Sequence, residues 1–253
     1  MQHIYAIINQ KGGVGKSTTA AALWAGLTLK GYKTLAVDLD AQANLTFIVG
    51  ADTDGKTALD MLTEEVPAAE TILHLDSGDI IPASKNLAGI DAVLDGTGRE
   101  YRLKEALEPV KDNYDYIIID TPPQMGIMTI NALTACNSVL IPAQADILSL
   151  QGIEQLTQTM QPVKKYCNPG LEIAGILLTR YSSRAALTRD LTEYTKQLAE
   201  KLKTKVFGSP IREGIAVKEA QINRQTLFEY APKSKAAADY AAFIEELLND
   251  ETR

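Results

Sequence analysis

A glycine-rich run that carries two lysines and two hydroxyl side chains lies between two apolar segments near the start of the chain. The run is Gln10-Lys11-Gly12-Gly13-Val14-Gly15-Lys16-Ser17-Thr18, after an apolar segment at 3–8 and before an Ala/Leu-rich one at 18–29. Read as strand, loop and helix, it places several backbone N–H groups and a helix N-terminus around one point. This array suits a polyphosphate, with Lys16 at the β- and γ-phosphates and the Ser17 hydroxyl on Mg²⁺.

The loop departs from the common phosphate-loop pattern, G-x-x-x-x-G-K-[ST], at its first position. Gln10 stands where that pattern has glycine, and a second lysine, Lys11, follows it. This is the deviant Walker A form. The alternative, a glycine-rich turn with a chance lysine, is disfavoured by the strand–loop–helix context.

Aspartates follow two predicted buried strands. Residues 34–37 predict a short strand that ends in Asp38-Leu39-Asp40. Residues 116–119 predict a central parallel strand that ends in Asp120, the Walker B arrangement, in which the carboxylate holds Mg²⁺ through a water. In doubly wound sheets such residues face the ligand crevice. An aspartate after a strand can also be a helix cap or turn residue, but a pair of them downstream of a phosphate loop favours a functional site.

The rest of the chain alternates predicted strands and helices. Further strands are expected at 80–83, 138–142, 172–179 and 206–207, and helices at 16–30, 58–62, 84–94, 98–110, 149–166, 189–203, 214–221 and 234–248. Such alternation predicts an α/β fold with a doubly wound, mostly parallel sheet and helices on both faces. No linker or internal repeat divides the sequence, so we expect one domain, residues 1–253.

Composition bounds the class of protein. The chain has 253 residues, 45% of them hydrophobic, which is ordinary for a folded α/β domain. Two cysteines, Cys136 and Cys167, fit a reducing compartment and form no metal-binding pattern. The first residues lack a basic leader, and no apolar run is long enough to span a bilayer. We therefore expect a cytoplasmic protein.

Charge is unevenly distributed along the chain. The net charge is −7, yet residues 180–235 hold 12 basic and 6 acidic residues. A basic segment can bind a polyanion locally even in an acidic protein, because screening limits the reach of distant charges. A solvated, lysine-rich helix surface is the alternative, and charge alone favours it.

Three motifs in this order resemble the ParA/Soj partition ATPases, within the wider deviant-Walker group that includes MinD. They are Lys11–Ser17, the run Val37-Asp38-Leu39-Asp40-Ala41-Gln42, and Ile119-Asp120-Thr121-Pro122-Pro123. The resemblance runs nearly end to end. Near the C-terminus it includes Pro210-Ile211-Arg212, Lys218-Glu219-Ala220 and Tyr230-Ala231-Pro232-Lys233-Ser234.

The resemblance implies an ATPase (P-loop NTPase) with ATP and Mg²⁺ as cofactors and a role for each motif residue. Lys16 would stabilise the β- and γ-phosphates, and Asp40 would orient the attacking water. Lys11 would reach across a homodimer to the partner's ATP, much as an arginine finger does. Ser17 and Asp120 would hold Mg²⁺. The expected ATP-binding residues are Lys11, Gly12, Gly13, Val14, Gly15, Lys16, Ser17 and Thr18, with Pro210, Ile211 and Arg212 around the adenine.

The family also implies a partner and a location. ATP-bound ParA-type dimers bind DNA without sequence preference, and a centromere-binding ParB-like protein stimulates their slow hydrolysis. A plasmid, chromosome or mobile-element partition protein, nucleoid-associated in its ATP state, is therefore expected. The first strand begins almost at residue 1, so no N-terminal helix-turn-helix domain is expected. Candidate DNA contacts are Arg180, Arg184, Arg189, Lys218 and Arg224, although the spacing from Arg212 to Glu219 is one residue longer than in the family pattern.

Three other protein classes share parts of this pattern. A MinD-like positioning ATPase would need a basic amphipathic C-terminal helix for membrane binding, whereas residues 245–251 are acidic, so no stable membrane association is expected. A nitrogenase iron-protein relative would need Cys136 and Cys167 to ligate a cluster, and their contexts do not fit. A bacterial tyrosine kinase would need a tyrosine-rich tail, which the sequence lacks.

Overall fold

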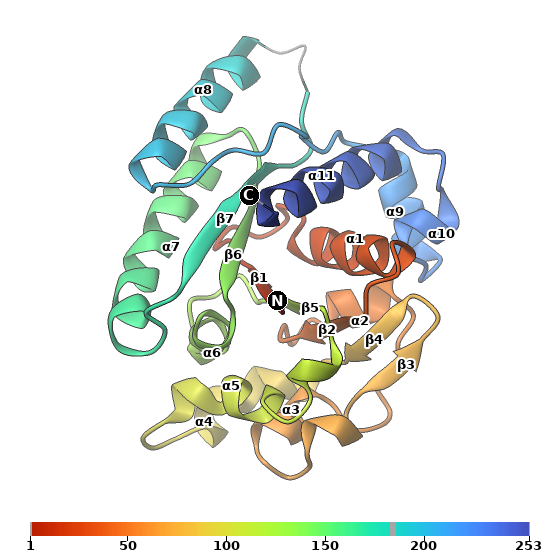
Figure 1. The fold of residues 1–253 in the computed structure, drawn as a ribbon, viewed down its shortest axis with the longest axis vertical. Coiled ribbons are helices and arrows are strands. Elements are labelled where there is room, and N and C mark those ends of the chain that lie inside the picture. Colours follow the sequence, from red (N-terminus) through yellow and green to blue (C-terminus); the bar gives the residue numbers. More distant parts are fainter. Residues whose placement is uncertain (1, 183–185, 253) are drawn as a thin grey trace.

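One seven-stranded sheet forms the centre of the molecule (Figure 1). The computed structural model describes residues 2–182 and 186–252, with only the backbone described for 186–189. The strand order is β3-β4-β2-β5-β1-β6-β7, and every pair is parallel except the β3–β4 hairpin. The strands are β1 His3–Ile7, β2 Thr34–Asp38, β3 Leu73–Leu75, β4 Gly78–Ile81, β5 Tyr116–Asp120, β6 Ser138–Ala143 and β7 Glu172–Leu178.

Helices cover both faces of the sheet, as the sequence predicts. One face carries α3 Ala58–Leu62, α4 Ile90–Val93, α5 Arg102–Leu107, α6 Ile127–Ala135, α7 Ile147–Tyr166 and α8 Ala186–Lys201. The other face carries α1 Lys16–Leu29, α2 Asn44–Ile48, α9 Ile215–Ile222, α10 Leu227–Tyr230 and α11 Lys235–Glu251. The fold is therefore a doubly wound α/β sandwich.

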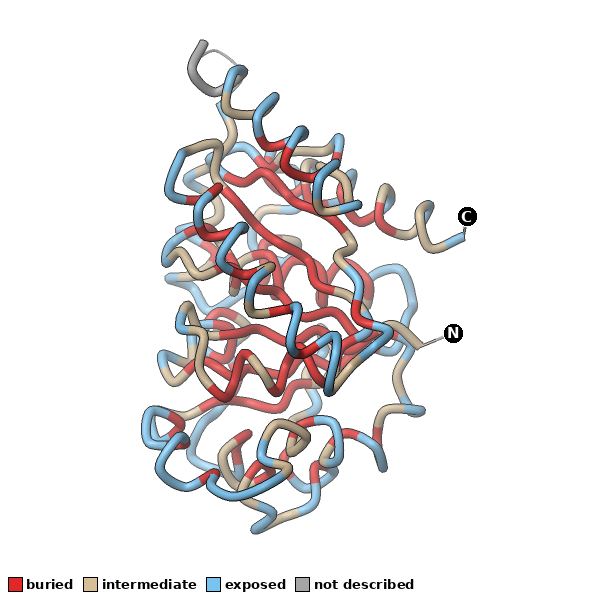
Figure 2. Tube along the Cα trace, turned by 90° about the vertical axis from the view of Figure 1, so that its left-hand side faces the viewer, coloured by how far each residue is buried: buried red, intermediate tan, exposed pale blue. Residues whose placement is uncertain are grey.

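The side chains of each strand alternate between two hydrophobic cores. In β1, Ile4 and Ala6 pack into the core under α6 and α7, whereas Tyr5 and Ile7 pack into the core under α1 and α11. Because both sides are covered, the central strands are buried along nearly their whole length (Figure 2). Double burial explains why these strands read as continuous apolar runs in the sequence.

The structure corrects several predicted elements; one is the expected helix 98–110, which is the 3-10 segment Arg99–Tyr101 followed by α5. Helix α7 begins at Ile147 with Asp146 as its N-cap, rather than Ser149; the Asp146 carboxylate accepts a hydrogen bond from the Ser149 N–H at 2.9 Å. The expected strand at 206–207 is a single bridge between Ile176 and Val206: the Phe207 N–H still donates to the Ile176 carbonyl, but the N–H groups of Gly208 and Ser209 donate to the Glu246 carboxylate. The expected helix 84–94 is a 3-10 segment followed by the single turn α4.

None of the helices in the described part of the chain has the length and apolar character that a membrane span requires.

Candidate nucleotide-binding site

The glycine loop joins the end of β1 to the start of α1, as predicted. Gly13 and Gly15 have φ values of 76° and 88°, in the left-handed region that a residue with a Cβ adopts only at a cost. Asn9, fully buried, fixes the start of the loop: its amide donates to the Pro142 carbonyl at 2.7 Å, and its Oδ1 accepts from the Lys11 N–H at 2.9 Å. The loop is therefore shaped before any ligand arrives.

Lys16 is 7% exposed at the first turn of α1. Burial lowers the pKa of its ammonium, and the nearby carboxylates of Asp120 and Asp40 act in the opposite direction. Among the described residues the ammonium donates only to the Lys11 carbonyl, at a long 3.4 Å. A buried cation with so few hydrogen-bond acceptors is well placed to bind an anion from the cleft.

Asp120 is fully buried at the end of β5, and neither of its carboxylate oxygens has a hydrogen-bond partner in the described part of the chain. Burial raises its pKa well above the ordinary value, and the negative charge of Asp38 adds to the rise, while the nearby Ser17 hydroxyl and Lys16 ammonium act against it. A buried carboxylate with unsatisfied oxygens, a hydroxyl and a cleft nearby fit the oxygen ligands that Mg²⁺ prefers. The residues present thus fit the metal that the sequence predicts.

Asp38 and Asp40, two residues apart, have different surroundings. The carboxylate of Asp38 is fully buried and accepts hydrogen bonds from the Thr46 N–H at 2.9 Å, the Thr46 hydroxyl at 2.8 Å and the Asp40 N–H at 3.1 Å. Burial raises the pKa of Asp38 to about 6, against these hydrogen bonds. Asp38 therefore holds the loop that follows it in place. The sequence alone does not show that Asp38 and Asp40 have different roles.

Asp40 opens onto a cleft of about 470 Å³. The cleft is lined by the glycine loop, by Asp40, and by the start of α2: Gly12, Gly13, Gly15, Lys16, Ser17, Thr18, Gln42, Asn44, Phe47 and Ile48, with Pro123, Arg180 and Gln221 completing the wall. A pocket of about 80 Å³ adjoins it and shares Gly15, Thr18, Arg180 and Gln221. Together they offer a polar end for phosphates and a smaller, partly apolar end for a base.

The predicted adenine loop is only partly in this small pocket. Ile211, buried, and Arg212 line it together with Val217 and Tyr240. The guanidinium of Arg212 is held by the Asp239 carboxylate, at 2.8 Å from Nε and 2.5 Å from Nη2. Pro210 lies outside the pocket wall. Both side chains therefore line the space for a base, Ile211 with apolar surface and Arg212 with a charge that is paired with Asp239.

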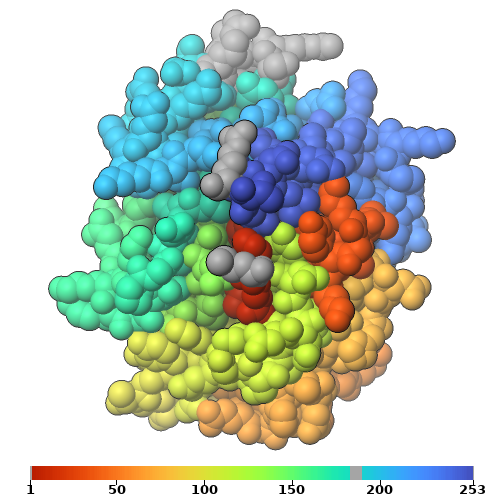
Figure 3. All heavy atoms as spheres, in the orientation of Figure 1, coloured from red at the N-terminus to blue at the C-terminus, as the bar shows by residue number. Residues whose placement is uncertain are grey.

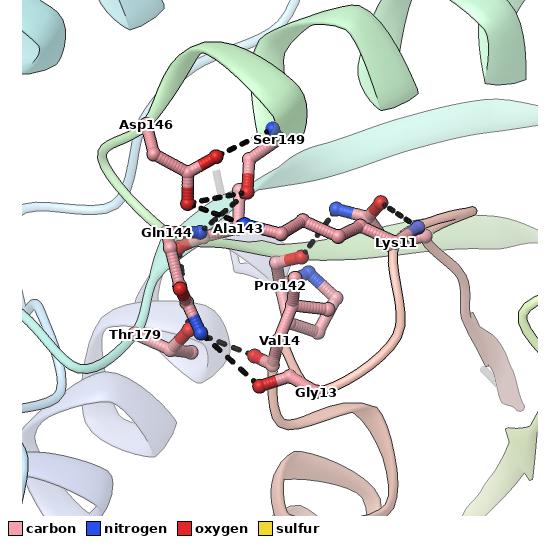
Figure 4. Close-up of polar contacts among 10 residues, drawn as sticks. Lys11, Gly13, Val14, Pro142, Ala143, Gln144, Asp146, Ser149 and Thr179 are labelled. Carbon is pink, nitrogen blue, oxygen red and sulfur yellow. Dashed lines mark hydrogen bonds and ion pairs between the residues drawn. The ribbon is translucent and has the colours of Figure 1, made fainter.

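The Lys11 side chain extends to Asp146 and binds it (Figure 4). Its ammonium lies 2.6 Å from Oδ2 of Asp146, whose other oxygen accepts from the Ser149 N–H and so caps α7. Burial would raise the pKa of Asp146, but the hydrogen bonds from Lys11 and Ser149 outweigh it and lower the pKa. No sequence pattern pairs Lys11 with Asp146, although an aspartate three residues before Ser149 is a cap signal.

Two further side chains, which the sequence does not predict, brace the loop. The Gln144 amide donates to the Gly13 carbonyl at 3.1 Å, and the Thr179 hydroxyl donates to the Val14 carbonyl at 2.8 Å (Figure 4). Both residues lie just beyond the ends of neighbouring strands, β6 and β7. Parallel strands bring their carboxyl ends to one edge of the sheet. The position of Gln144 and Thr179 directly after predicted strands is therefore the sequence signal that could have identified them.

The candidate DNA contacts in the described part of the chain come from elements on both faces of the sheet. Arg180 lies in the cleft wall, and Lys218 lies on α9 with its side chain 63% exposed. Arg224, just after α9, donates to the Ala51 carbonyl at 2.9 Å and lies over the ring of Phe47. Arg189 is in the first turn of α8, on the opposite face of the sheet from α9, and its side chain is not described. Arg184 lies outside the described residues.

Comparison with known proteins finds relatives along the whole chain. A family model described as "AAA domain" matches residues 2–173. The sporulation initiation inhibitor protein Soj of Bacillus subtilis (strain 168) is 40% identical over 253 residues, 98% of each chain. The chromosome partitioning protein ParA of Myxococcus xanthus is 38% identical, covering 98% of this chain and 89% of its own.

Solved structures share the fold at full length. A Mycobacterium smegmatis protein, described as cobyrinic acid a,c-diamide synthase with bound ADP and magnesium, has a TM-score of 0.86 at 35% identity, covering 100% of this chain and 96% of its own. A putative plasmid partition protein of Borrelia burgdorferi bound to AMPPNP has a TM-score of 0.84 at 25% identity, covering 99% and 100%. With 35–40% identity to Soj and ParA proteins over its length, the chain belongs to the ParA/Soj family of ATPases.

Proposed function

We propose that the protein binds Mg²⁺ and ATP in the cleft between the glycine loop and α2, dimerises in the ATP state, and then binds DNA without sequence preference. A centromere-binding ParB-like partner stimulates its slow hydrolysis, and the cycle serves DNA partition. One observation carries the proposal: the buried Lys16 cation and Asp40 line the same cleft, and the fully buried Asp120 carboxylate, whose oxygens are unsatisfied, lies close enough to interact electrostatically with both. Such a triad matches the parts that phosphoryl transfer to water requires.

Each side chain has a defined task in hydrolysis. Lys16, desolvated and next to the loop amides, stabilises the charge that develops on the γ-phosphoryl oxygens as the bond to ADP breaks. Asp40 accepts a hydrogen bond from the attacking water and orients it. The Gln42 N–H donates to the Asp40 carboxylate at 3.0 Å and restrains its position. The Ser17 hydroxyl and Asp120 would hold Mg²⁺, which neutralises phosphate charge when bound.

Dimerisation would complete the site. In the single chain, Lys11 is bound to Asp146 and not directed at its own phosphate cleft. A lysine held at the mouth of the site by a partly exposed carboxylate is available to a phosphate of a second subunit, which offers more negative charge than Asp146 does. Lys11 would thus supply positive charge in trans. ATP favours the dimer by mass action because it binds both subunits at once.

The position of α11 supports a role in DNA partition over that of a membrane-associated positioning ATPase. Its apolar face, Tyr240, Phe243, Ile244 and Leu247, is buried in the core. Its acidic end lies against β1 and β5, where Glu251 accepts hydrogen bonds from the hydroxyl of Tyr5 and, at 2.6 Å, from that of Tyr116 (Figure 3 shows this face). This helix is net negative and buries its apolar face, so it offers lipid neither an apolar surface nor a net positive charge.

The decisive experiment measures DNA binding with no nucleotide, with ADP and with ATP, in rising salt. We expect binding to random-sequence DNA with ATP alone, steeply weakened by salt because it rests on phosphate contacts. The Lys16→Ala variant should lose ATP binding and, with it, DNA binding. Binding that is equal in all three nucleotide states would contradict the nucleotide switch, and ATP affinity retained by Lys16→Ala would contradict the phosphate site.

A further inference from the structure

Arg180 stands at the junction of the cleft and the small pocket. It is an exposed residue just beyond β7, and it is part of the wall of both spaces. Lys16, Ser17 and the loop amides lie at the cleft end, and Ile211, Val217 and Tyr240 lie at the pocket end. A ligand with phosphates at the first end and a base at the second would pass Arg180 midway.

The backbone of Arg180 is strained. Its φ is 49°, in the left-handed region that is uncommon for residues other than glycine, asparagine and aspartate. Such conformations cost free energy and persist where the surroundings impose them, often at functional sites. An exposed loop residue could relax this strain at no cost to the core, so something must hold it.

The two neighbours of Arg180 impose the conformation. On one side, the Thr179 N–H donates to the Ala143 carbonyl at 2.8 Å, and its hydroxyl donates to the Val14 carbonyl of the glycine loop at 2.8 Å. On the other side, the Tyr181 N–H donates to the Ile211 carbonyl at 2.9 Å. Arg180 is thus fixed between a residue tied to the phosphate loop and a residue tied to the wall of the base pocket.

The guanidinium of Arg180 has no ion pair or hydrogen bond with any described residue. Arg102, Arg212 and Arg224, in contrast, are engaged with Glu64, Asp239 and the Ala51 carbonyl. Glu213, the carboxylate of the small pocket, lies 3.9 Å from Lys218 instead. The Arg180 guanidinium is a planar fork of five N–H donors, and it has no described partner. It lies in the wall of a cleft suited to polyphosphate, and its geometry matches that of a phosphate group.

We infer that Arg180 is a nucleotide-binding residue whose guanidinium contacts the α-phosphate, between the β/γ-phosphates at Lys16 and the base at Ile211. This assignment deepens the proposed function and rests on it. It replaces a DNA contact at this position with a contact to the nucleotide. Arg180 then pairs with Lys16 as the second cation of the cleft and sets affinity for both ATP and ADP, because both nucleotides carry the α-phosphate.

The test is the affinity of the full chain for a fluorescent ADP and its displacement by ADP and by pyrophosphate. The main variant is Arg180→Asn, because asparagine tolerates the left-handed backbone and the variant removes only the side chain's charge and fork. Arg180→Lys keeps the charge without the fork, and Lys218→Ala removes another exposed cation from the same pocket. Thermal unfolding of each variant without nucleotide checks that the fold is intact.

We expect Arg180→Asn to weaken ADP binding about tenfold, as for the loss of one charge-assisted contact, with an unchanged unfolding temperature. Arg180→Lys should lose less, Lys218→Ala should lose under twofold, and displacement by pyrophosphate, which can sit on the loop alone, should be unaffected. ADP affinity within twofold of wild type in Arg180→Asn, or an equal loss for ADP and pyrophosphate, would overturn the assignment. Loss of ATP binding in Lys16→Ala would leave the proposed function standing in either case.

A second measurement distinguishes a nucleotide contact at Arg180 from a DNA contact. With ATP at a concentration that saturates the variant, Arg180→Asn should bind DNA like wild type, with the same salt dependence. A reduced salt slope together with normal ADP affinity would assign Arg180 to DNA and overturn the inference.

Discussion

The ammonium of Lys11 lies 2.6 Å from Oδ2 of Asp146 in the same chain. The side chains are 25% and 34% exposed, so the contact is screened by solvent and is worth at most about 1 kcal/mol. The pair is thus strong enough to orient Lys11 in the single chain and weak enough to exchange for a phosphate. The additional lysine of the deviant loop, Lys11, and the N-cap of α7, Asp146, are coupled through this contact.

Replacing Asp146 by asparagine should increase the fraction of dimer with a non-hydrolysable ATP analogue at limiting protein concentration. Asparagine keeps the cap on α7 but removes the charge that competes for Lys11. The measurement is molar mass by light scattering after gel filtration. The free energy of unfolding should change by less than about 1 kcal/mol.

Two controls accompany this variant. Asp146→Ala removes the cap as well and should cost about 1 kcal/mol more in stability. In a protein that carries both Asp146→Asn and Lys11→Ala, the gain in dimer should be absent, because there is then no lysine for the loss of the Asp146 charge to release. A dimer fraction in Asp146→Asn equal to that of wild type would show that Asp146 does not restrain Lys11.

Replacing Asp40 by alanine should leave ATP binding intact and block turnover. The phosphate contacts come from the glycine loop and Lys16, whereas Asp40 acts on the attacking water. The variant should therefore accumulate as an ATP-bound dimer on DNA, with a hydrolysis rate at least about 100-fold below wild type. Phosphate release and DNA binding measured side by side test this, and wild-type turnover would rule out the role of Asp40.

Ionisation of Asp38 should make the nucleotide-free protein less stable as the pH rises from about 4 to above 6. The pKa of Asp38 is raised to about 6, so in this window the folded state binds a proton that the unfolded state has released. The difference between the folded and unfolded pKa corresponds to a loss on the order of 3 kcal/mol by pH 7. The pKa of Asp120, also raised, acts in the same direction.

Urea unfolding at pH 5 and pH 7.5 measures this effect. The Asp38→Asn variant is the control: it is less stable, because its amide nitrogen cannot accept from Thr46, but the difference between the two pH values should be smaller than in wild type. An equal pH dependence in both proteins would show that Asp38 does not titrate in this range.

Lys218 and Arg224 should respond differently to substitution by alanine. Lys218 is exposed, so its loss should weaken DNA binding moderately and reduce the salt slope by about one, as for one phosphate contact. Arg224 instead joins the end of α9 to Ala51 and Phe47, so its loss should lower the unfolding free energy by about 1 kcal/mol. Salt-dependent DNA binding and urea unfolding of both variants distinguish the two roles. A stability loss in Lys218→Ala equal to that in Arg224→Ala would contradict this division.

The central parallel strands, the phosphate loop and the family can be predicted from the order of the amino acids alone. Buried parallel strands read as apolar runs, and the loop needs glycines at Gly13 and Gly15 and a lysine at a set spacing, so local pattern is enough to find them. The places of Asp40 and Asp120 after strands can be predicted as well, because a doubly wound fold brings its strand ends to one edge.

Which distant side chains meet depends instead on how the elements pack. Lys11 and Asp146 are 135 residues apart, and Thr179 and Val14 are 165 apart, so no local pattern relates them. The same holds for Arg180, which the sequence groups with a basic segment by charge alone. Its strained backbone is set by hydrogen bonds to Val14 and Ile211 through its neighbours, and these exist only once β7 lies beside β6. Charge along a chain is a local property, whereas the surface that a charge faces is set by packing.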